Sequence, residues 1–257
     1  LHIHDRRQRQ MCIRDRDVRG GRVVKGINFE DIVDAGDPAD AAQRYDEEGA
    51  DEICMLDIDA SYEARSTTLE TVEKIANQVF IPFTVGGGIK TVNDVEVLLK
   101  SGADKVSINT SAIINPNLIK EASKEFGSQC IVVAIDAKLN GENWSVYTHG
   151  GKNKTDLDAL SWSKEVEQLG AGEILMTSMD KDGTKSGFDN NLNSSLAENL
   201  NIPLIASGGA GSINHLVDAV KLGKADAVLA ASIFHYKEIT ISKVKDSLKN
   251  EGLSVRL

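Results

Sequence analysis

The sequence predicts a (β/α)8 TIM barrel, in which parallel strands alternate with helices, built from two similar half-barrels. Two apolar runs that begin with Ile-Pro and end in consecutive glycines, 81–89 and 202–211, lie 121 residues apart. Further pairs of similar segments repeat at offsets of 119 to 122 residues: 49–57 with 170–178, 103–111 with 225–232, and Asp17-Val18 with Asp136-Ala137. This offset is too long for a solenoid repeat. Four strand-helix units in each half, over about 250 residues, predict one barrel with an internal two-fold repeat.

Composition narrows the class of protein. The chain has 257 residues, of which 41% are hydrophobic, and a formal net charge of -10. An acidic balance disfavours nonspecific binding to nucleic acid or membranes, so backbone amides and helix ends must bind any anion. We find no apolar run of about 18 residues, no charged-then-apolar leader, and no metal-binding spacing among the cysteines. We therefore expect a cytoplasmic protein with no metal, no cofactor, and no nucleic-acid or membrane partner.

Strand and helix signals alternate regularly from Asp17 onward. Asp37-Pro38 supplies an N-cap and a proline at the first helical position, which predicts a helix to about Glu48. The segment that opens with 20–26 is predicted to be a long loop, and Asn140-Gly141 with Gly150-Gly151 flank a predicted β-hairpin. The other strands are expected at 52–57, 82–85, 105–109, 130–136, 173–177, 204–207 and 225–230, and the other helices at about 68–78, 92–100, 116–126, 157–169, 191–199, 213–222 and 239–250. No linker divides residues 17–257, which we expect to form a single barrel domain.

Residues 1–16 do not fit this pattern. They are polar and basic where a barrel needs an apolar first strand. Residues 11–16 also match the translation of the end of a common sequencing-library transposase adapter, ATG TGT ATA AGA GAC AG. We therefore predict that 1–16 is a non-native segment that replaces, and corrupts, the first strand; the alternative is a genuine basic N-terminal arm.

Catalytic residues of such a barrel lie at the C-terminal ends of its strands, the mouth of the barrel. Asp17 and Asp136 are expected to end the first and fifth strands, on opposite sides of the mouth, with room for a substrate between them. Two carboxylates so placed suit a general acid that faces a general base. A lone strand-end aspartate would more often cap the following turn, but a symmetric pair favours catalysis.

Glycine turns follow the third and seventh strands and adjoin the turns after the fourth and eighth. Glycine lets backbone N–H groups approach an anion closely, so each half offers one anion cradle. Two cradles across one mouth predict a substrate with a phosphate at each end. The candidate ligands are Gly88, Asn109, Thr110, Thr177, Ser207, Gly208, Gly209, Ala231 and Ser232. The polar loop 180–187, with Asp182 and Gly183, is either ligand-facing or an ordinary turn.

Charged residues begin several strands at the opposite end, the floor of the barrel. If Asn109 and Thr177 point inward at the mouth, strand alternation places Lys105 and Glu173 inside the floor, and Glu52 begins its strand in the same way. Ionised groups inside a protein are costly unless they are paired, so we expect a salt-bridged ring. The residues alone favour a structural plug.

Several of these segments resemble the cyclase-subunit family of imidazole glycerol phosphate synthase, a lyase of histidine biosynthesis. They are Asp17-Val18 with 21–26, and 83–89, 104–110, 134–138, 182–187 and 206–211. The resemblance covers essentially all of 17–257. It implies that ammonia, released from glutamine by a separate glutaminase subunit, passes through the barrel and reacts with a bis-phosphorylated ribulosyl formimino carboxamide ribonucleotide. The products would be imidazole glycerol phosphate and an aminoimidazole carboxamide ribonucleotide.

The resemblance also implies a role for individual residues. Asp17 and Asp136 resemble the acid/base pair, and Lys25 resembles a mobile-loop lysine that closes over the substrate. The charged residues of the floor, Glu52, Lys105 and Glu173, resemble a gate for ammonia, which replaces the structural plug as their expected role. Asp104 is expected to be exposed beside them, where the glutaminase would dock to form a heterodimer.

The resemblance fails at the start of the chain. The family has an apolar first strand that supplies an arginine to the gate, whereas Met11 stands at that position here. Two alternative functions stay open: the sister isomerase of the same pathway, which is also a two-half barrel, and a catalytically silent phosphate-binding partner of the glutaminase. Segments 25–29 and 107–110, with the charges of the floor, favour the cyclase.

Overall fold

Parallel strands close into a barrel in the computed structural model, which describes residues 10–19, 22–27, 30–57 and 65–256, with side chains over 37–56 and 68–256. In order around the barrel the strands are β1 (Gln10–Arg19), β4 (Glu52–Asp57), β5 (Phe83–Gly86), β6 (Lys105–Ile108), β7 (Ile131–Asn140), β10 (Glu173–Ser178), β11 (Leu204–Ser207) and β12 (Ala227–Ala230). Strand β10 pairs with both β7 and β11, and β12 pairs with β1, which closes the ring. The predicted (β/α)8 fold is confirmed.

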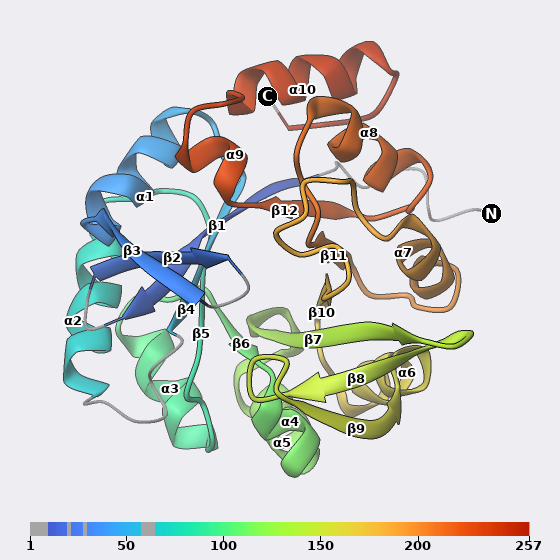
Figure 1. The fold of residues 1–257 in the computed structure, drawn as a ribbon. Helices are drawn as coiled ribbons and strands as arrows, with labels where there is room; N and C mark the ends of the chain where they lie inside the picture. Colours follow the sequence, from blue (N-terminus) through green and yellow to red (C-terminus); the bar gives the residue numbers. More distant parts are fainter. Residues whose placement is uncertain (1–9, 20–21, 28–29, 58–64, 257) are drawn as a thin grey trace.

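Helices surround this ring (Figure 1). They are α1 (Pro38–Glu47), α2 (Arg65–Ala76), α3 (Val92–Lys100), α5 (Asn117–Phe126), α6 (Ala159–Leu169), α7 (Asn190–Ala197), α8 (Ile213–Lys221) and α10 (Ile241–Asn250). The predicted cap of α1 is confirmed, because Asp37 Oδ1 accepts a hydrogen bond from Ala39 N at 2.8 Å. Among the described residues, none of the helices has the length and hydropathy of a membrane-spanning segment.

Short helices follow β6 and β12 that the sequence did not predict. They are α4 (Thr110–Ile114) and α9 (Ser232–His235), and a 3-10 turn, η2 (Ser128–Cys130), precedes β7. The residues that precede α4 and α9, Asn109 and Ala231, have similar backbone angles, with φ/ψ of -116°/-99° and -121°/-70°. The internal repeat therefore extends to the local backbone at the mouth.

Each half also carries an antiparallel ribbon at the mouth. In the second half β7 continues past Asp136 into β8 (Asn143–Thr148) and β9 (Asn153–Asp158), as the predicted hairpin requires. In the first half the predicted long loop is wrong, because β2 (Arg22–Ile27) and β3 (Glu30–Gly36) extend β1 in the same way. Strand β1 runs beyond the barrel and offers a pairing edge to the β-branched residues of this segment, which favour strands.

Strand β1 includes residues 10–16 of the segment that we predict to be non-native. It pairs with β12 in regular parallel register, from Gln10 with Ala227 to Ile13 with Ala230. Against β4 the register shifts: β1 advances three residues from Arg14 to Asp17 while β4 advances two, from Cys54 to Leu56. This extra residue is the signature of a β-bulge. The side chains of β1 lie outside the described residues, so the non-native origin of 1–16 stays a prediction.

Two apolar layers occupy the inside and the outside of the barrel wall. Alternate residues of each strand face opposite sides, so Val133 and Ile135 of β7 join the large core beneath the helices, whereas Val132 and Ala134 belong to a separate inner cluster. The rest of this inner cluster is Cys54, Leu175, Ile205, Ala227 and Leu229, with Leu56 against it. Most of these side chains are short or medium in length. The centre of the barrel is therefore a mostly apolar layer between a charged floor and a polar mouth.

Candidate active site

Three residues predicted for the mouth are neighbours in the structure. Asp136 of β7 pairs in register with Thr177 of β10, and Asn109 Nδ2 donates to Asp136 Oδ2 at 2.9 Å. This hydrogen bond fixes the orientation of the carboxyl group that we predict to act as an acid or base. Asn109 Oδ1 is buried and has no hydrogen-bond partner among the described residues. This corner of the mouth thus offers a carboxylate held in place and a carbonyl oxygen available to a ligand.

The second predicted aspartate lies on the opposite strand. Strands β1 and β7 are separated by three strands on one side of the ring and three on the other. Asp17 pairs with Val24 of β2, as Asp136 pairs with Tyr147 of β8, so each aspartate lies where a barrel strand continues into its ribbon. The backbone therefore repeats the arrangement of the pair, while the side chain of Asp17 lies outside the described residues.

Lys25 lies on β2, where it pairs with Val33 of β3. This corrects the prediction that Lys25 belongs to a loop, because its segment is part of an antiparallel ribbon that extends β1. Its side chain lies outside the described residues. The lysine's predicted contact with the substrate stays a prediction.

The first predicted anion cradle would combine the turn after β5 with the start of α4. Gly87 and Gly88 have φ values of 105° and 65°, a left-handed backbone that favours glycine. Strands β5 and β6 are neighbours, so Gly88 and Thr110 follow adjacent strands. Thr110 Oγ1 accepts a hydrogen bond from His149 N at 2.9 Å, which ties the β8–β9 turn to this cradle. The sequence had not indicated His149.

The second cradle is the same construction with a loop packed onto it. Gly208 and Gly209 have φ values of 91° and 105°, and a Cβ added at Gly209 would lie 2.1 Å from Gly187 O. Gly187 N donates to Gly209 O at 2.9 Å. A Cβ at Gly208 would lie 3.4 Å from Asp182 N, so loop 179–188 passes directly over the glycine turn. This packing by itself requires glycine at Gly209, and the ligand-facing role of the loop stays a prediction. Ala231 and Ser232 follow the neighbouring strand β12.

The charged residues of the floor meet as predicted. Lys105 Nζ donates to Glu52 Oε2 at 2.7 Å and to Glu173 Oε1 at 2.8 Å. Thr84 Oγ1 donates to Glu52 Oε1 at 2.6 Å. The Glu52 side chain is only 3% exposed, and those of Lys105 and Glu173 are 14% and 17% exposed. The predicted salt bridges are confirmed for these three residues, which we call the floor triad.

Burial and charge act in opposite directions on the floor triad. Burial by itself would lower the pKa of Lys105, but the carboxylates of Glu52 and Glu173 outweigh it and the pKa is raised. Burial raises the pKa of Glu173; Lys105 opposes this rise, and the nearby charge of Glu52 adds to it. One ammonium group therefore compensates two carboxylates incompletely. The Lys105 ammonium stays charged across the physiological pH range, whereas the raised pKa of Glu173 makes this carboxylate easier to protonate than an ordinary glutamate.

A third polar side chain of β6 lies between the floor and the mouth. Ser107 alternates with Lys105 and Asn109 and so faces the same side of the strand. It is 3% exposed, and its Oγ has no hydrogen-bond partner within the described part of the chain. A buried polar atom without a partner is uncommon in folded proteins. The inner face of β6 thus carries polar groups along its whole length, from the triad to Asn109.

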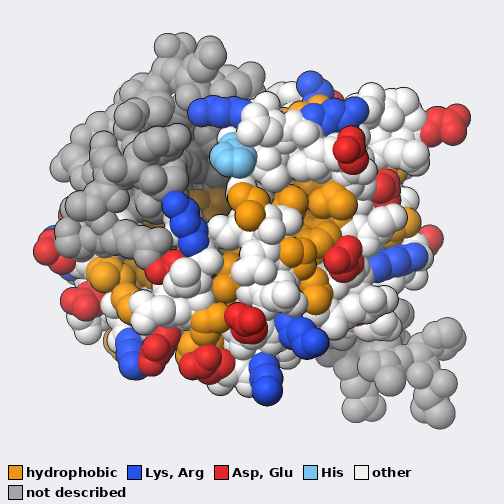
Figure 2. Space-filling view, turned by 90° about the horizontal axis from the view of Figure 1, so that it is seen from below, with side chains coloured by type: hydrophobic (Ala, Val, Ile, Leu, Met, Phe, Trp, Pro, Cys, Tyr) orange, Lys and Arg blue, Asp and Glu red, His pale blue; other side chains and the backbone are white. Residues whose placement is uncertain are grey.

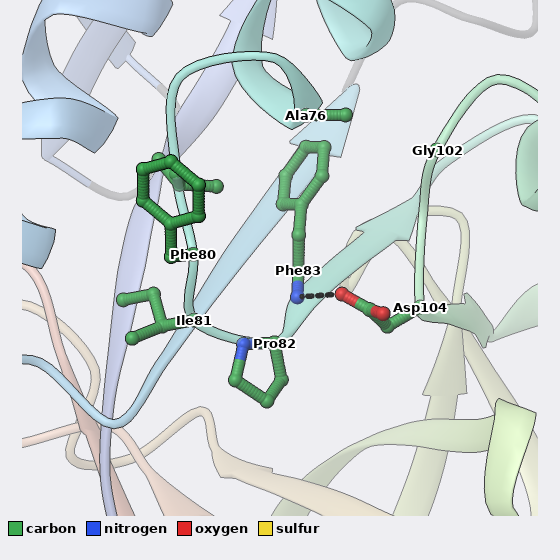
Figure 3. A pocket seen from close by; sticks show the side chains of 8 residues that line it. Ala76, Phe80, Ile81, Pro82, Phe83, Gly102 and Asp104 are labelled. Atoms are coloured by element: carbon green, nitrogen blue, oxygen red, sulfur yellow. Dashed lines mark hydrogen bonds between the residues drawn. The ribbon is translucent and has the colours of Figure 1, made fainter.

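A cavity of about 300 Å³ opens on the outside of the floor beside Asp104 (Figure 3). The Phe80 side chain at its edge is 95% exposed, although Phe80 N is held by Asp46 Oδ2 at 2.7 Å. Asp104 is exposed, as predicted. Its carboxylate also accepts from Phe83 N at 2.8 Å, and Asp226 accepts from Leu204 N at 3.1 Å in the other half. Asp104 therefore has a structural role as well as an exposed position.

Charge on the visible surface is mixed. Figure 2 shows acidic and basic side chains scattered around one face of the molecule, with hydrophobic side chains between them. No broad basic patch of the kind that binds nucleic acid is seen among the described residues of this face. Across all the described residues, no group of three or more His, Cys, Asp or Glu side chains is placed so that it could hold a metal ion.

A protein-family model matches most of the chain. The model of the family described as "Histidine biosynthesis protein" matches residues 12–240. The match includes all the predicted site residues, from Asp17 to Ser232, and begins inside the segment that we predict to be non-native.

Proposed function

The chain belongs to the histidine biosynthesis protein family, and we propose that within it the chain is the cyclase subunit of imidazole glycerol phosphate synthase. The chain is an enzyme of histidine biosynthesis, and its family includes both the cyclase and the sister isomerase. Under this proposal it works in the cytoplasm with a glutaminase subunit and needs no metal or cofactor. The choice between the two enzymes rests on the residues of the barrel interior.

The observation that carries the proposal is the floor triad. An isomerase takes its only substrate from the mouth and has no need of a controlled passage through the floor. A cyclase supplied with ammonia from below needs a passage that admits a small neutral molecule and resists ions. Lys105, clamped between two carboxylates, presents paired charges whose separation or desolvation is costly. Ser107 and the apolar inner cluster above it would then line the route to Asn109.

The mouth supports the acid/base part of the reaction. Addition of ammonia and expulsion of the carboxamide ribonucleotide require one group that removes protons and another that donates them. Asp136, oriented by Asn109, is suited to the first task, and Asp17 on the opposite strand can face the substrate from the other side. The two glycine cradles would bind the terminal phosphates and hold the reacting centre between the aspartates. Lys25 would close over the substrate from the β2–β3 ribbon.

The outside of the floor supports a partner that docks there. The exposed ring of Phe80, whose backbone N–H donates to Asp46, lies beside a cavity and an exposed carboxylate (Figure 3). Aromatic side chains, phenylalanine among them, are enriched at protein–protein interfaces. Asp104 precedes Lys105 directly, so a glutaminase bound at this surface would release ammonia next to the triad.

The test compares the two enzymes on their own substrates. With ammonium salts at alkaline pH, the cyclase should convert the bis-phosphorylated ribulosyl substrate to imidazole glycerol phosphate without any partner. It should not open the ring of the isomerase's substrate. Ring opening in the absence of ammonia would instead identify the isomerase. Failure of both reactions, with retained binding of the glutaminase, would identify a catalytically silent partner.

A further inference from the structure

The loop 179–188, which follows β10, is fixed at both ends to the β7–β8 ribbon. At its start Met179 N donates to Ala137 O at 2.8 Å and Leu139 N donates to Asp180 Oδ2 at 2.7 Å. At its end Asp189 Oδ2 accepts from Trp144 Nε1 at 3.0 Å. These contacts hold the two ends, but they leave the middle of the loop to be positioned by other groups.

The middle of the loop lies on the second cradle. Gly187 N bonds to Gly209 O, and a Cβ added at Gly211 would lie 2.3 Å from Lys185 O. Lys185 itself has a φ of 54°, a left-handed conformation that is uncommon for residues other than glycine, asparagine and aspartate. Such a conformation persists where the surroundings enforce it, and it is frequent at ligand-binding sites.

The Lys185 side chain crosses to the segment after α9. Its Nζ donates to Glu238 Oε1 at 2.6 Å and to Glu238 Oε2 at 2.9 Å. Glu238 N donates to Ile233 O at 2.9 Å, so Glu238 is tied to the helix that begins at Ser232. The two side chains are 44% and 39% exposed, and exposed ion pairs contribute little to global stability. A weak contact can nevertheless control whether one loop is open or closed.

We propose that Lys185 and Glu238 form a clasp that holds loop 179–188 closed over the second phosphate cradle. Both are positioning residues: Lys185 fixes the loop that carries Asp182 and Gly183, and Glu238 joins it to the segment that carries Ser232. The clasp thus assembles one phosphate site from three segments of the chain. This inference rests on the proposed function for the identity of the ligand, but not for the contacts themselves.

The test uses Lys185→Met, Glu238→Gln and the charge reversal Lys185→Glu with Glu238→Lys. Amide hydrogen exchange without any ligand should be about tenfold faster at Gly187 in both single variants, because the loop opens more often. With ammonia as nitrogen source, the KM for the bis-phosphorylated substrate should rise about tenfold while kcat changes less than about twofold. The charge reversal should restore both quantities at least in part.

Lys221→Met is the matched control, because Lys221 Nζ pairs with Glu251 Oε2 at 2.6 Å on the outside of the barrel with similar exposure. It should leave Gly187 exchange and KM unchanged. Unchanged Gly187 exchange in the clasp variants would overturn the proposal. So would a KM effect in Lys185→Met alone, because Lys185 would then bind phosphate directly. Inorganic phosphate should also raise the Tm of the parent protein; no such rise would reject the phosphate site of the proposed function and leave the exchange result to decide the clasp.

Discussion

The floor and the mouth of the barrel are built from the same strands but differ in whether their polar side chains have partners within the protein. At the floor Lys105 is paired with Glu52 and Glu173, and Glu52 receives a further hydrogen bond from Thr84. At the mouth Asn109 Oδ1 is buried with no partner among the described residues, and the turns after β5 and β11 contain glycines with positive φ. The charged groups of the floor triad find their partners within the protein, whereas a buried polar atom at the mouth has none among the described residues. A filter needs the first arrangement and a binding site needs the second.

The largest expected effect is at the mouth. Asp136→Asn and Asp17→Asn should each lower kcat by about a hundredfold or more with a small change in KM, because an amide cannot exchange protons while the phosphate cradles are intact. Steady-state kinetics with ammonia measures this. Asp246→Asn, an exposed change on α10, is the control. Turnover at the parent level in either aspartate variant would remove that residue from the acid/base pair.

The second-largest expected effect is on stability and concerns β1, which runs from the floor of the barrel to its mouth. Replacing residues 1–16 by an apolar first strand of the family type should raise the unfolding midpoint by about 5–10 °C, because each unpaired charge turned into the barrel costs several kcal/mol. Thermal unfolding followed by circular dichroism measures the change. A midpoint that stays the same would count against a non-native segment, and so would recovery of these codons from genomic DNA.

A smaller effect tests the floor as a filter. Lys105→Ala, made with a restored first strand, should leave ammonia-driven activity within about twofold of the parent but uncouple the glutaminase, because bulk water and ions then leak through the floor. The ratio of glutamate formed to imidazole product formed in the reconstituted complex should rise above one. If this ratio stays near one and the ammonia-driven rate is unchanged, the triad is a structural plug.

The smallest effect is the pH dependence of the floor. Burial and the nearby Glu52 raise the pKa of Glu173, and only Lys105 opposes this rise, so Lys105→Met should raise that pKa further. A carboxyl group whose folded pKa exceeds its unfolded value binds more protons in the folded state, so its stabilising contribution falls as pH rises through the folded pKa. The variant should therefore lose more stability than the parent as the pH rises above the ordinary range of a glutamate carboxyl. Equal pH profiles of Tm would show that Lys105 does not control Glu173.

The sequence by itself determined the fold and the faces of its strands. Boundaries were right where strong local signals coincide, as in helix 92–100, which begins at a capping box, and strand 204–207, which lies between a proline and glycines. Strand alternation placed Lys105 and Glu173 inside the floor before any contact was known. The repeat of Asp17 and Asp136 placed both on the barrel strands that lie opposite each other. These properties depend on periodicity and turn chemistry, which neighbouring residues encode.

Only the tertiary structure decided which polar groups meet. Lys105 pairs with residues 53 and 68 positions away, and Lys185 with one 53 positions away, so no local pattern records these contacts. Residues 22–27 and 30–36 contain β-branched residues that favour strands, but the sequence shows no partner for them. They form a ribbon because β1 offers an unpaired edge. Asn109 bonds to Asp136 because β6 and β7 are adjacent in the ring. Closure of the barrel brings strands that are distant in the sequence side by side. This closure decides which polar side chains pair, which the sequence alone does not specify.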